Sequence, residues 1–248
     1  MRYLVLSDIH GNLEALEAAL AAGASRGYDQ LLVLGDLVGY CADPNGVIDR
    51  LRGLGPAALI RGNHDKVASG VDDAEGFNLI ARSAIEWTFG ALTAENRAFL
   101  AALPAGPVSV DDLVEICHGT PYDEDAYVFD ELDALRALES ASRPVCLFGH
   151  THVPVAFRRS EDGLETYVAE KEVETLAVSF EESSDYLVNP GSVGQPRDGN
   201  PRAAFGIVDT TARQMDLVRV SYPVQVTQAK IVRAGLPEVL AKRLAIGR

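Results

Sequence analysis

Residues 3–12 read Tyr-Leu-Val-Leu-Ser-Asp-Ile-His-Gly-Asn, an apolar run that passes directly into a cluster of polar residues. The run Tyr3–Leu6 predicts a short buried strand. Asn12 can cap a following helix, in which Leu13, Leu16 and Leu20 recur at helical spacing. A strand that leads through a polar turn into a helix is the first half of a strand–helix–strand unit.

The pattern then repeats along the first third of the chain. Gln30–Leu34 and Ala57–Arg61 predict two further strands, and Asp43–Arg52 predicts the helix between them. Such alternation predicts an α/β fold with right-handed crossovers and a parallel sheet. In these sheets, functional groups gather at the carboxyl ends of the strands.

The rest of the chain is expected to hold fewer helices and more strands. Residues 75–103 predict two helical segments that end before Leu103-Pro104. Residues 223–248 predict a C-terminal helical tail of two short helices, separated by Gly235-Leu236-Pro237. Further strands are expected at five apolar runs: Leu113–Cys117, Val145–Phe148, Tyr186–Val188, Ala203–Val208 and Met215–Val220. A length of 248 residues favours one domain over residues 1–248.

Residues 160–186 form the most acidic part of the chain, with nine acidic residues and one lysine. Alternating apolar and polar residues in Glu165–Val168 and Leu176–Phe180 predict a β-hairpin made of these two strands. We interpret its charge as protection of a solvated sheet edge rather than as a functional lid.

Composition excludes several classes of protein. An apolar content of 47% with 23% charged residues is typical of a folded globule and not of a disordered chain. No apolar run approaches the roughly 18 residues that a membrane-spanning helix needs. The net charge of −14 argues against nonspecific binding to nucleic acids or anionic membranes. The three cysteines lack a Cys-x-x-Cys pair, which favours a reducing, cytoplasmic location.

All five histidines of the chain lie just beyond apolar runs, beside Gly, Asp, Asn or Thr. One histidine in such a place is most often an ordinary polar residue, but five indicate a common site. They belong to the segments Ser7-Asp8-Ile9-His10-Gly11-Asn12, Gly62-Asn63-His64-Asp65, His118-Gly119-Thr120-Pro121 and Gly149-His150-Thr151-His152, and Gly35-Asp36 ends the second predicted strand in the same way.

These residue types favour a centre that binds two metal ions. In an extended segment, residues i and i+2 project to one side, so Asp8 can converge with His10, and His150 with His152. Imidazole and carboxylate suit Mn, Fe, Zn, Ni or Co ions, among which Mn is weakly favoured. Two ions about 3.5–4 Å apart can clamp the oxygens of a displacement at phosphorus, and they lower the pKa of a bound water towards ~7, which supplies hydroxide.

The ordered set Asp-x-His, Gly-Asp, Gly-Asn-His-Asp, His and Gly-His-x-His over residues 8–152 resembles the calcineurin-like metallophosphoesterases. The resemblance implies a four-layered α-β-β-α sandwich with the site at the strand carboxyl ends. It also implies that Asp8, His10 and His152 hold one metal ion, that Asn63, His118 and His150 hold the second, and that Asp36 bridges both. His64 would then be catalytic, either as general acid towards the leaving group or by binding the phosphoryl oxygens.

Departures from the family pattern narrow the range of expected substrates. The Ser/Thr protein phosphatases of this superfamily continue the second motif as Gly-Asp-x-x-Asp-Arg-Gly, whereas this chain has Gly35-Asp-Leu-Val-Gly-Tyr-Cys41. The protein-phosphatase interpretation is thereby weakened, and His64 has to be oriented by another group, for which Asp65 and Asp43 are the candidates.

The loop Asn189–Asp198 resembles the bacterial branch described as phosphodiesterase or diadenosine-tetraphosphatase-like. Arg197 is either a bidentate clamp for a substrate phosphate or part of a structural ion pair. Asn12, Tyr40 and Tyr122 are further candidates for lining the substrate pocket.

The sequence therefore predicts a phosphoesterase that binds a small phosphorylated substrate, with phosphodiesters or nucleotides slightly favoured. The alternatives within the enzyme class are a phosphomonoesterase of small metabolites and a dinucleoside polyphosphate hydrolase. The alternative outside it is a catalytically silent scaffold, as in the retromer subunit that shares this fold. That subunit has lost part of the constellation, whereas this chain keeps every position.

Overall fold

The computed structural model describes residues 1–248. The first third of the chain forms parallel strands with helical crossovers, as predicted. The strands lie in the order β3-β2-β1. The elements are β1 (Arg2–Leu6), α1 (Leu13–Arg26), β2 (Gln30–Val33), α2 (Pro44–Leu54) and β3 (Ala58–Leu59).

Asn12 caps α1 and also fastens this helix to distant parts of the chain. Its Oδ1 accepts hydrogen bonds from the backbone N–H of Ala15 (3.2 Å) and from Thr227 Oγ1 (3.0 Å). Its Nδ2 donates to the carbonyl of Gly194 (2.9 Å) and to the hydroxyl of Tyr222 (3.2 Å). All the hydrogen-bonding capacity of this buried amide is therefore used inside the protein.

Three helices follow β3: α3 (Asn63–Ser69), α4 (Leu79–Ala91) and α5 (Ala94–Ala101). Helices α4 and α5 are the two predicted segments within residues 75–103. Thr93 caps α5 by accepting a hydrogen bond from the backbone N–H of Asn96. Helix α3 was not predicted, because it begins inside the polar motif Gly62–Asp65 and has no long apolar repeat. Asp65 starts it by accepting a hydrogen bond from Gly62 N (3.0 Å).

The second sheet has the strand order β4-β5-β6-β10-β7-β8. Its centre is parallel, and β4, β7 and β8 pair antiparallel with their neighbours. The elements are β4 (Val108–Ser109), β5 (Val114–Ile116), α6 (Glu131–Ser140), β6 (Val145–Leu147), β7 (Val155–Ser160), β8 (Gly163–Val168) and β10 (Asp185–Asn189). Helix α6 was not predicted.

The hairpin predicted within residues 160–186 is wrong in its pairing. β8 pairs with β7 through the two-residue turn Glu161-Asp162, whereas β9 (Thr175–Ser179) pairs with β12 in the first sheet. A two-residue turn closes a hairpin more readily than the six-residue segment between β8 and β9. Both strands lie at sheet edges, the position for which acidic residues were expected to give protection.

The first sheet is completed by β11 (Ala203–Asp209) and β12 (Gln214–Val220). The tail forms α7 (Val224–Arg233) and α8 (Glu238–Leu244), with the break at the predicted Gly-Leu-Pro sequence. No helix is both long and apolar enough to span a bilayer.

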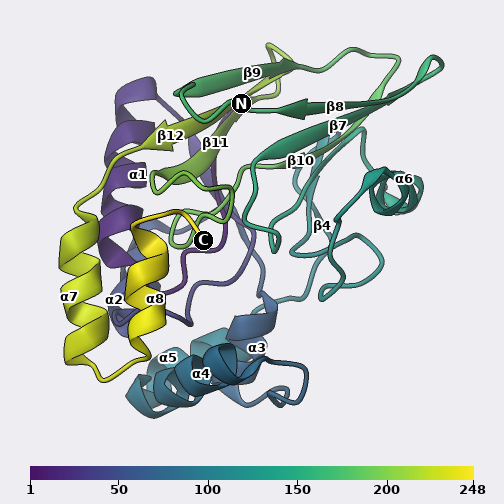
Figure 1. The fold of residues 1–248 in the computed structure, drawn as a ribbon. Coiled ribbons are helices and arrows are strands. Elements are labelled where there is room, and N and C mark those ends of the chain that lie inside the picture. Colours follow the sequence, from purple (N-terminus) through teal and green to yellow (C-terminus); the bar gives the residue numbers. More distant parts are fainter.

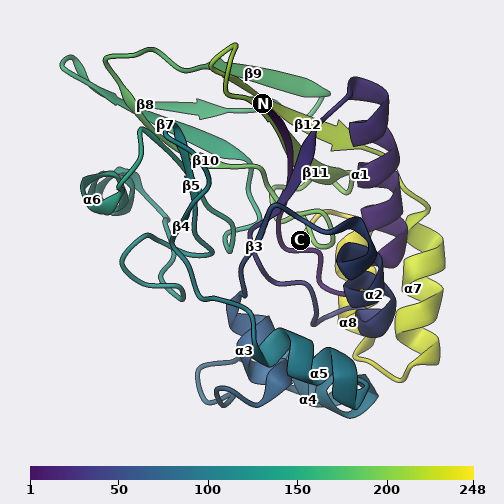
Figure 2. The same ribbon diagram turned by 180° about the vertical axis from the view of Figure 1, so that it is seen from behind.

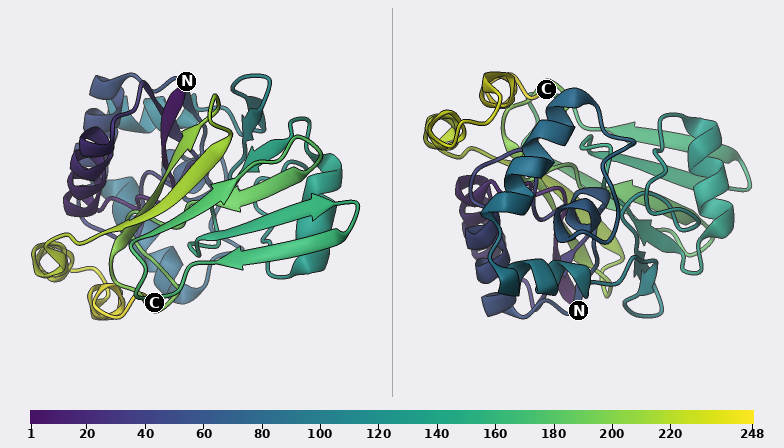
Figure 3. Two further views of the ribbon diagram at one scale, coloured as in Figure 1. Left: turned by 90° about the horizontal axis from the view of Figure 1, so that it is seen from above. Right: turned by 90° about the horizontal axis from the view of Figure 1, so that it is seen from below.

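The two sheets pack face to face, and helices cover their outer faces (Figure 3). Val5, Leu32, Val114, Leu147 and Val188 belong to the apolar core between the sheets. A second core lies between the first sheet and helices α1 and α2, and a third lies between the second sheet and α6. The protein is therefore the four-layered α-β-β-α sandwich that was predicted. β1 runs towards the end of the sandwich where α3, α4 and α5 lie (Figures 1 and 2).

Replacing Asn12 with alanine should lower the free energy of unfolding by about 2 kcal/mol, because it removes a helix cap and leaves buried partners without hydrogen bonds. Urea unfolding measures this loss. Asn78→Ala is the matched control, since Asn78 caps α4 at an exposed end, and it should cost about 1 kcal/mol. A loss for Asn12→Ala no larger than that of the control would contradict the fastening role.

Candidate metal centre

The predicted polar residues do converge, but through a different backbone conformation from the one expected. Asp8, His10, Asp36, His150 and His152 all have positive φ, between 51° and 65°. This left-handed conformation is uncommon for residues other than glycine and costs about 1–3 kcal/mol each when strained. The expectation of an extended segment was therefore wrong. Five such residues at the ends of strands indicate that the fold stabilises this loop geometry for a site.

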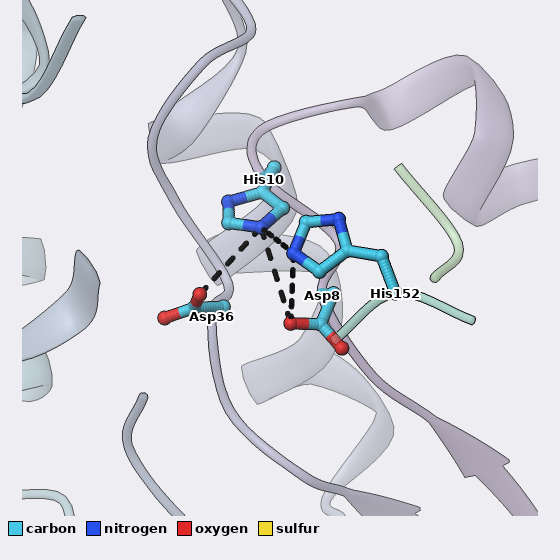
Figure 4. Close-up of side chains that lie close together, drawn as sticks. All are labelled: Asp8, His10, Asp36 and His152. Carbon is cyan, nitrogen blue, oxygen red and sulfur yellow. Dashed lines mark hydrogen bonds and ion pairs between the residues drawn. The ribbon is translucent and has the colours of Figure 1, made fainter. Parts of the chain in front are cut away.

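The first cluster brings together Asp8, His10, Asp36 and His152, all of them buried (Figure 4). His152 Nε2 lies 3.1 Å from His10 Nε2 and 3.3 Å from Asp8 Oδ1. His10 Nε2 lies 3.5 Å from Asp36 Oδ2 and 4.0 Å from Asp8 Oδ1. Four ligand atoms from three separate loops thus surround one point.

The two imidazoles of this cluster are held in one tautomer. His10 Nδ1 lies 3.0 Å from the carbonyl of Val38, and His152 Nδ1 lies 2.6 Å from the carbonyl of Gln195. A carbonyl oxygen can only accept, so each Nδ1 carries the proton and each Nε2 presents a lone pair. Two lone pairs and carboxylate oxygens that face one another repel unless a cation lies between them. This donor set fits a divalent transition metal, with the backbone contacts that such ligands require.

The second cluster shares Asp36 and adds His118 and His150. His118 Nε2 lies 3.5 Å from Asp36 Oδ2 and 3.3 Å from Asn63 Oδ1, while its Nδ1 donates to the carbonyl of Leu34 (2.8 Å). His150 does not group with His152, although they are two residues apart. The structure therefore brings together all seven residues that the family pattern implies as ligands, in two clusters with a common carboxylate.

Electrostatics in the clusters favour ionised carboxylates, and they favour neutral imidazoles at His150 and His152 but a charged one at His118. Burial lowers the pKa of His152, and it lowers the pKa of His150 to about 3. Burial alone would raise the pKa of Asp8 and Asp36, but nearby histidines, led by His152 and His118 respectively, hold both pKa values below the usual range. Against the effect of burial, Asp36 raises the pKa of His118 to about 10. Asp36 thus attracts positive charge to this point.

Comparison with known proteins agrees with this geometry. Residues 1–213 match the model of the calcineurin-like phosphoesterase superfamily domain. The chain belongs to this superfamily. It is a metal-dependent phosphoester hydrolase, and its clustered histidines and aspartates fit divalent metal binding.

Three relatives are similar to the chain over most of its length. The crystal structure of a metallophosphoesterase from Sphaerobacter thermophilus is 36% identical, with a TM-score of 0.89, and the match covers 100% of this chain and 99% of that one. The uncharacterized protein MJ0912 of Methanocaldococcus jannaschii is 34% identical over 98% of this chain and 97% of its own length. Phosphodiesterase YfcE of Escherichia coli is 27% identical over 84% of this chain and 88% of its own.

His64 lies beside both clusters, and packing orients it instead of a carboxylate. Its ring centroid is 4.9 Å from that of His10, 4.5 Å from that of Tyr40 and 4.7 Å from that of Phe77. Its Nδ1 is buried without a hydrogen-bond partner. Asp65 Oδ1 instead accepts from the backbone N–H groups of Leu37 and Val38.

The other proposed orienting group, Asp43, also makes no contact with His64. It forms an ion pair with Lys230 at 2.6 Å. Neither candidate carboxylate therefore orients the imidazole, and the aromatic contacts do so.

Of the four predicted substrate contacts, the structure places Tyr40 and Arg197 at the site. Arg197 Nη2 lies 3.3 Å from the hydroxyl of Tyr40 and 3.1 Å from Gln195 Oε1. Its buried Nε has no hydrogen-bond partner, and none of the ion pairs includes Arg197. The alternative of a structural ion pair is therefore wrong, and the guanidinium keeps donors available for a ligand.

The predictions for Asn12 and Tyr122 are wrong. Asn12 uses its whole amide to cap α1, as described above. Tyr122 packs on the outer core against α6, with the guanidinium of Arg136 4.2 Å from its ring centroid. Sequence reasoning missed Tyr127, whose ring lies 3.8 Å from that of His150. Asp130 caps α6, and this helix-start signal could have been read from the sequence. It would have shown that residues 121–129 form one loop, in which Tyr127 is as good a candidate for a substrate contact as Tyr122.

Replacing Gly39 with alanine should reduce kcat about 10²-fold while metal content is retained. A Cβ at Gly39 would lie 2.5 Å from His64 Nδ1, so the imidazole has to move. Steady-state kinetics on an aryl phosphoester and elemental analysis measure the two quantities. Gly53→Ala is the control, because a Cβ there meets nothing within 4 Å. Full turnover in Gly39→Ala would show that the position of His64 is unimportant.

Proposed function

We propose that the protein is a binuclear phosphoesterase that hydrolyses small phosphodiesters or nucleotides. The observation that carries this proposal is the position of Asp36, whose carboxylate is common to both donor clusters. One shared carboxylate is the usual arrangement for two ions held about 3.5–4 Å apart. Asp8, His10 and His152 would hold one ion, and Asn63, His118 and His150 the other.

Two bound divalent ions supply Lewis acidity and a water that is more acidic than bulk water. The protein's own residues perform the remaining tasks. Arg197 donates to the phosphoryl oxygens, which become more negative in the transition state. His64 gives a proton to the leaving oxygen. The carbonyls of Leu34, Val38 and Gln195 keep the histidine ligands in their required tautomers.

The similarity to YfcE, which is named a phosphodiesterase, supports a diester substrate. The site also has room for substituents on the phosphate, because a cavity of about 370 Å³ is lined by His64, Asn63 and Tyr40 beside the clusters. A phosphomonoesterase and a dinucleoside polyphosphate hydrolase remain the alternatives. The complete ligand set argues against a silent scaffold.

The ions are proposed to be Mn, Fe, Zn, Ni or Co, with Mn as the first choice for reconstitution, because imidazole and carboxylate accept all of them. The net charge of −14 supports a small phosphorylated molecule rather than a nucleic acid as partner. The three cysteines are free and buried, which supports the proposed cytoplasmic location.

Asp36→Asn should reduce the metal content at both positions, whereas Asn63→Ala should reduce it at one. The reason is that the Asp36 carboxylate contributes to both clusters and the Asn63 amide to the second alone. Elemental analysis of purified protein after dialysis against Mn²⁺ gives the stoichiometry. Loss of a single ion in Asp36→Asn would refute the bridging role.

Protein stripped of metal and reloaded with Mn²⁺ should hydrolyse bis(4-nitrophenyl) phosphate with a higher kcat/KM than 4-nitrophenyl phosphate. His64→Ala should keep its metal content and lose about 10²–10⁴-fold in kcat on the diester, since a positioned proton donor contributes that much. A preference for the monoester would support the phosphatase alternative. The proposed function would be refuted if the protein turned over neither these esters nor dinucleoside polyphosphates with Mn, Fe, Zn, Ni or Co.

A further inference from the structure

A second cavity, of about 610 Å³, adjoins the metal centre on the side of the second sheet. It reaches the centre at Thr151, which lies between His150 and His152, and at Arg197. Tyr127 lines both this cavity and the one beside His64. Tyr127 is therefore common to the lining of both spaces, of which the first includes the donor residues Asn63 and His150.

The second cavity is chemically unlike the first. The first has Lys66, Asp72, Asp73 and Asp125 in its lining. The second is mainly apolar, and its apolar side chains come from the loop before α6, from the segment that follows His152 and from the hairpin β7–β8. These residues are Tyr127, Val128, Phe129, Val153, Val155, Phe157 and Val168. We name this space the β7–β8 cavity.

Aromatic rings give the β7–β8 cavity a flat wall. The rings of Tyr127 and Phe129 are nearly parallel, with an interplanar angle of 8° and centroids 4.9 Å apart. Phe129 is 78% exposed and Val168 is 62% exposed. Large apolar side chains left open beside a buried polar site are typical of a ligand surface.

We propose that the β7–β8 cavity binds an aromatic group, such as an aryl ring or a nucleobase, carried by the substrate phosphate. This inference rests on the proposed phosphodiesterase function and extends it to the substrate class. Parallel rings favour stacking of a planar group. Arg197 lies where the phosphate of such a ligand would enter, and Asp130 and Glu131 in the lining disfavour a second anionic group.

The position of His64 decides which ester bond breaks. His64 lines the first cavity and not the β7–β8 cavity. The oxygen that takes a proton from His64 therefore belongs to the group in the first cavity. Water adds a hydroxyl group to phosphorus, the bond from phosphorus to that oxygen breaks, and an alcohol leaves. The aromatic group in the β7–β8 cavity stays on the phosphate, so the second product is an aromatic phosphomonoester.

Two diesters with one leaving group test the cavity through turnover. Bis(4-nitrophenyl) phosphate and methyl 4-nitrophenyl phosphate both release 4-nitrophenolate and differ only in the retained group. Phe129→Ala should lower the ratio of kcat/KM for the bis(4-nitrophenyl) ester to kcat/KM for the methyl ester about tenfold, because it removes a stacking ring. Leu132→Ala is the matched control, since Leu132 is 75% exposed but does not line the cavity, and it should leave the ratio as in the parent protein.

Binding without turnover provides a second measurement. Calorimetric titration of diphenylphosphinate, whose P–C bonds are not hydrolysed, at several temperatures should give a negative heat-capacity change, because apolar surface is buried. Dimethyl phosphate should not give this signal, and Phe129→Ala should reduce it. The measurement needs no hydrolysis, so it is independent of the proposed function.

The outcomes separate the two proposals. Absence of all phosphoester hydrolysis would refute the function, and the calorimetry would still support or overturn the cavity. Hydrolysis with an unchanged ratio and an unchanged heat-capacity change in Phe129→Ala would overturn the cavity inference alone. Sedimentation analysis tests whether a second copy of the chain occupies the cavity instead. If Phe129→Ala dissociates an oligomer and leaves the ratio of kcat/KM values unchanged, the surface is an interface between copies, and the inference is wrong.

Discussion

The position of the Asp36 carboxylate is the constraint on which the rest of the site depends. Its Oδ2 faces His10 and His118, one in each cluster, at 3.5 Å. Its Oδ1 accepts a hydrogen bond from the backbone N–H of His64 (2.9 Å), which fixes the carboxylate and the start of α3 together. Asp65 then joins the loop after β2 to the loop after β3. A single buried carboxylate therefore sets both clusters and the place of His64.

The donor residues of the two clusters come from both sheets, so the apolar core between the sheets determines the distances in the site. Asp8, Asp36 and Asn63 follow strands of the first sheet, whereas His118 and His150 follow strands of the second. Close-packed side chains between the sheets keep the two sets of strand ends in register.

The sequence predicted most of the strands and the polar motifs that follow them, because these depend on local patterns. It did not predict the left-handed backbone at Asp8 or His150, since that conformation is imposed by contacts between loops that are distant in sequence. The pairing of β8 with β7 and of β9 with β12 likewise depends on which sheet each edge joins. Tyr127 was missed for the same reason, because the course of its loop is set by α6 and the second sheet.

The glycines of the motifs follow from how closely these loops approach one another. A Cβ at Gly62 would overlap the carboxylate of Asp36, and a Cβ at Gly149 would overlap the hydroxyl of Ser7 and approach Asp8 Oδ2. Ser7 in turn donates to Asp8 Oδ2 (2.6 Å), and His150 N donates to the same carboxylate. The glycine before Asn63 and the glycine before His150 therefore leave the space that an aspartate of the neighbouring loop occupies. Each motif is needed for the geometry of another motif as well as for its own donor side chains.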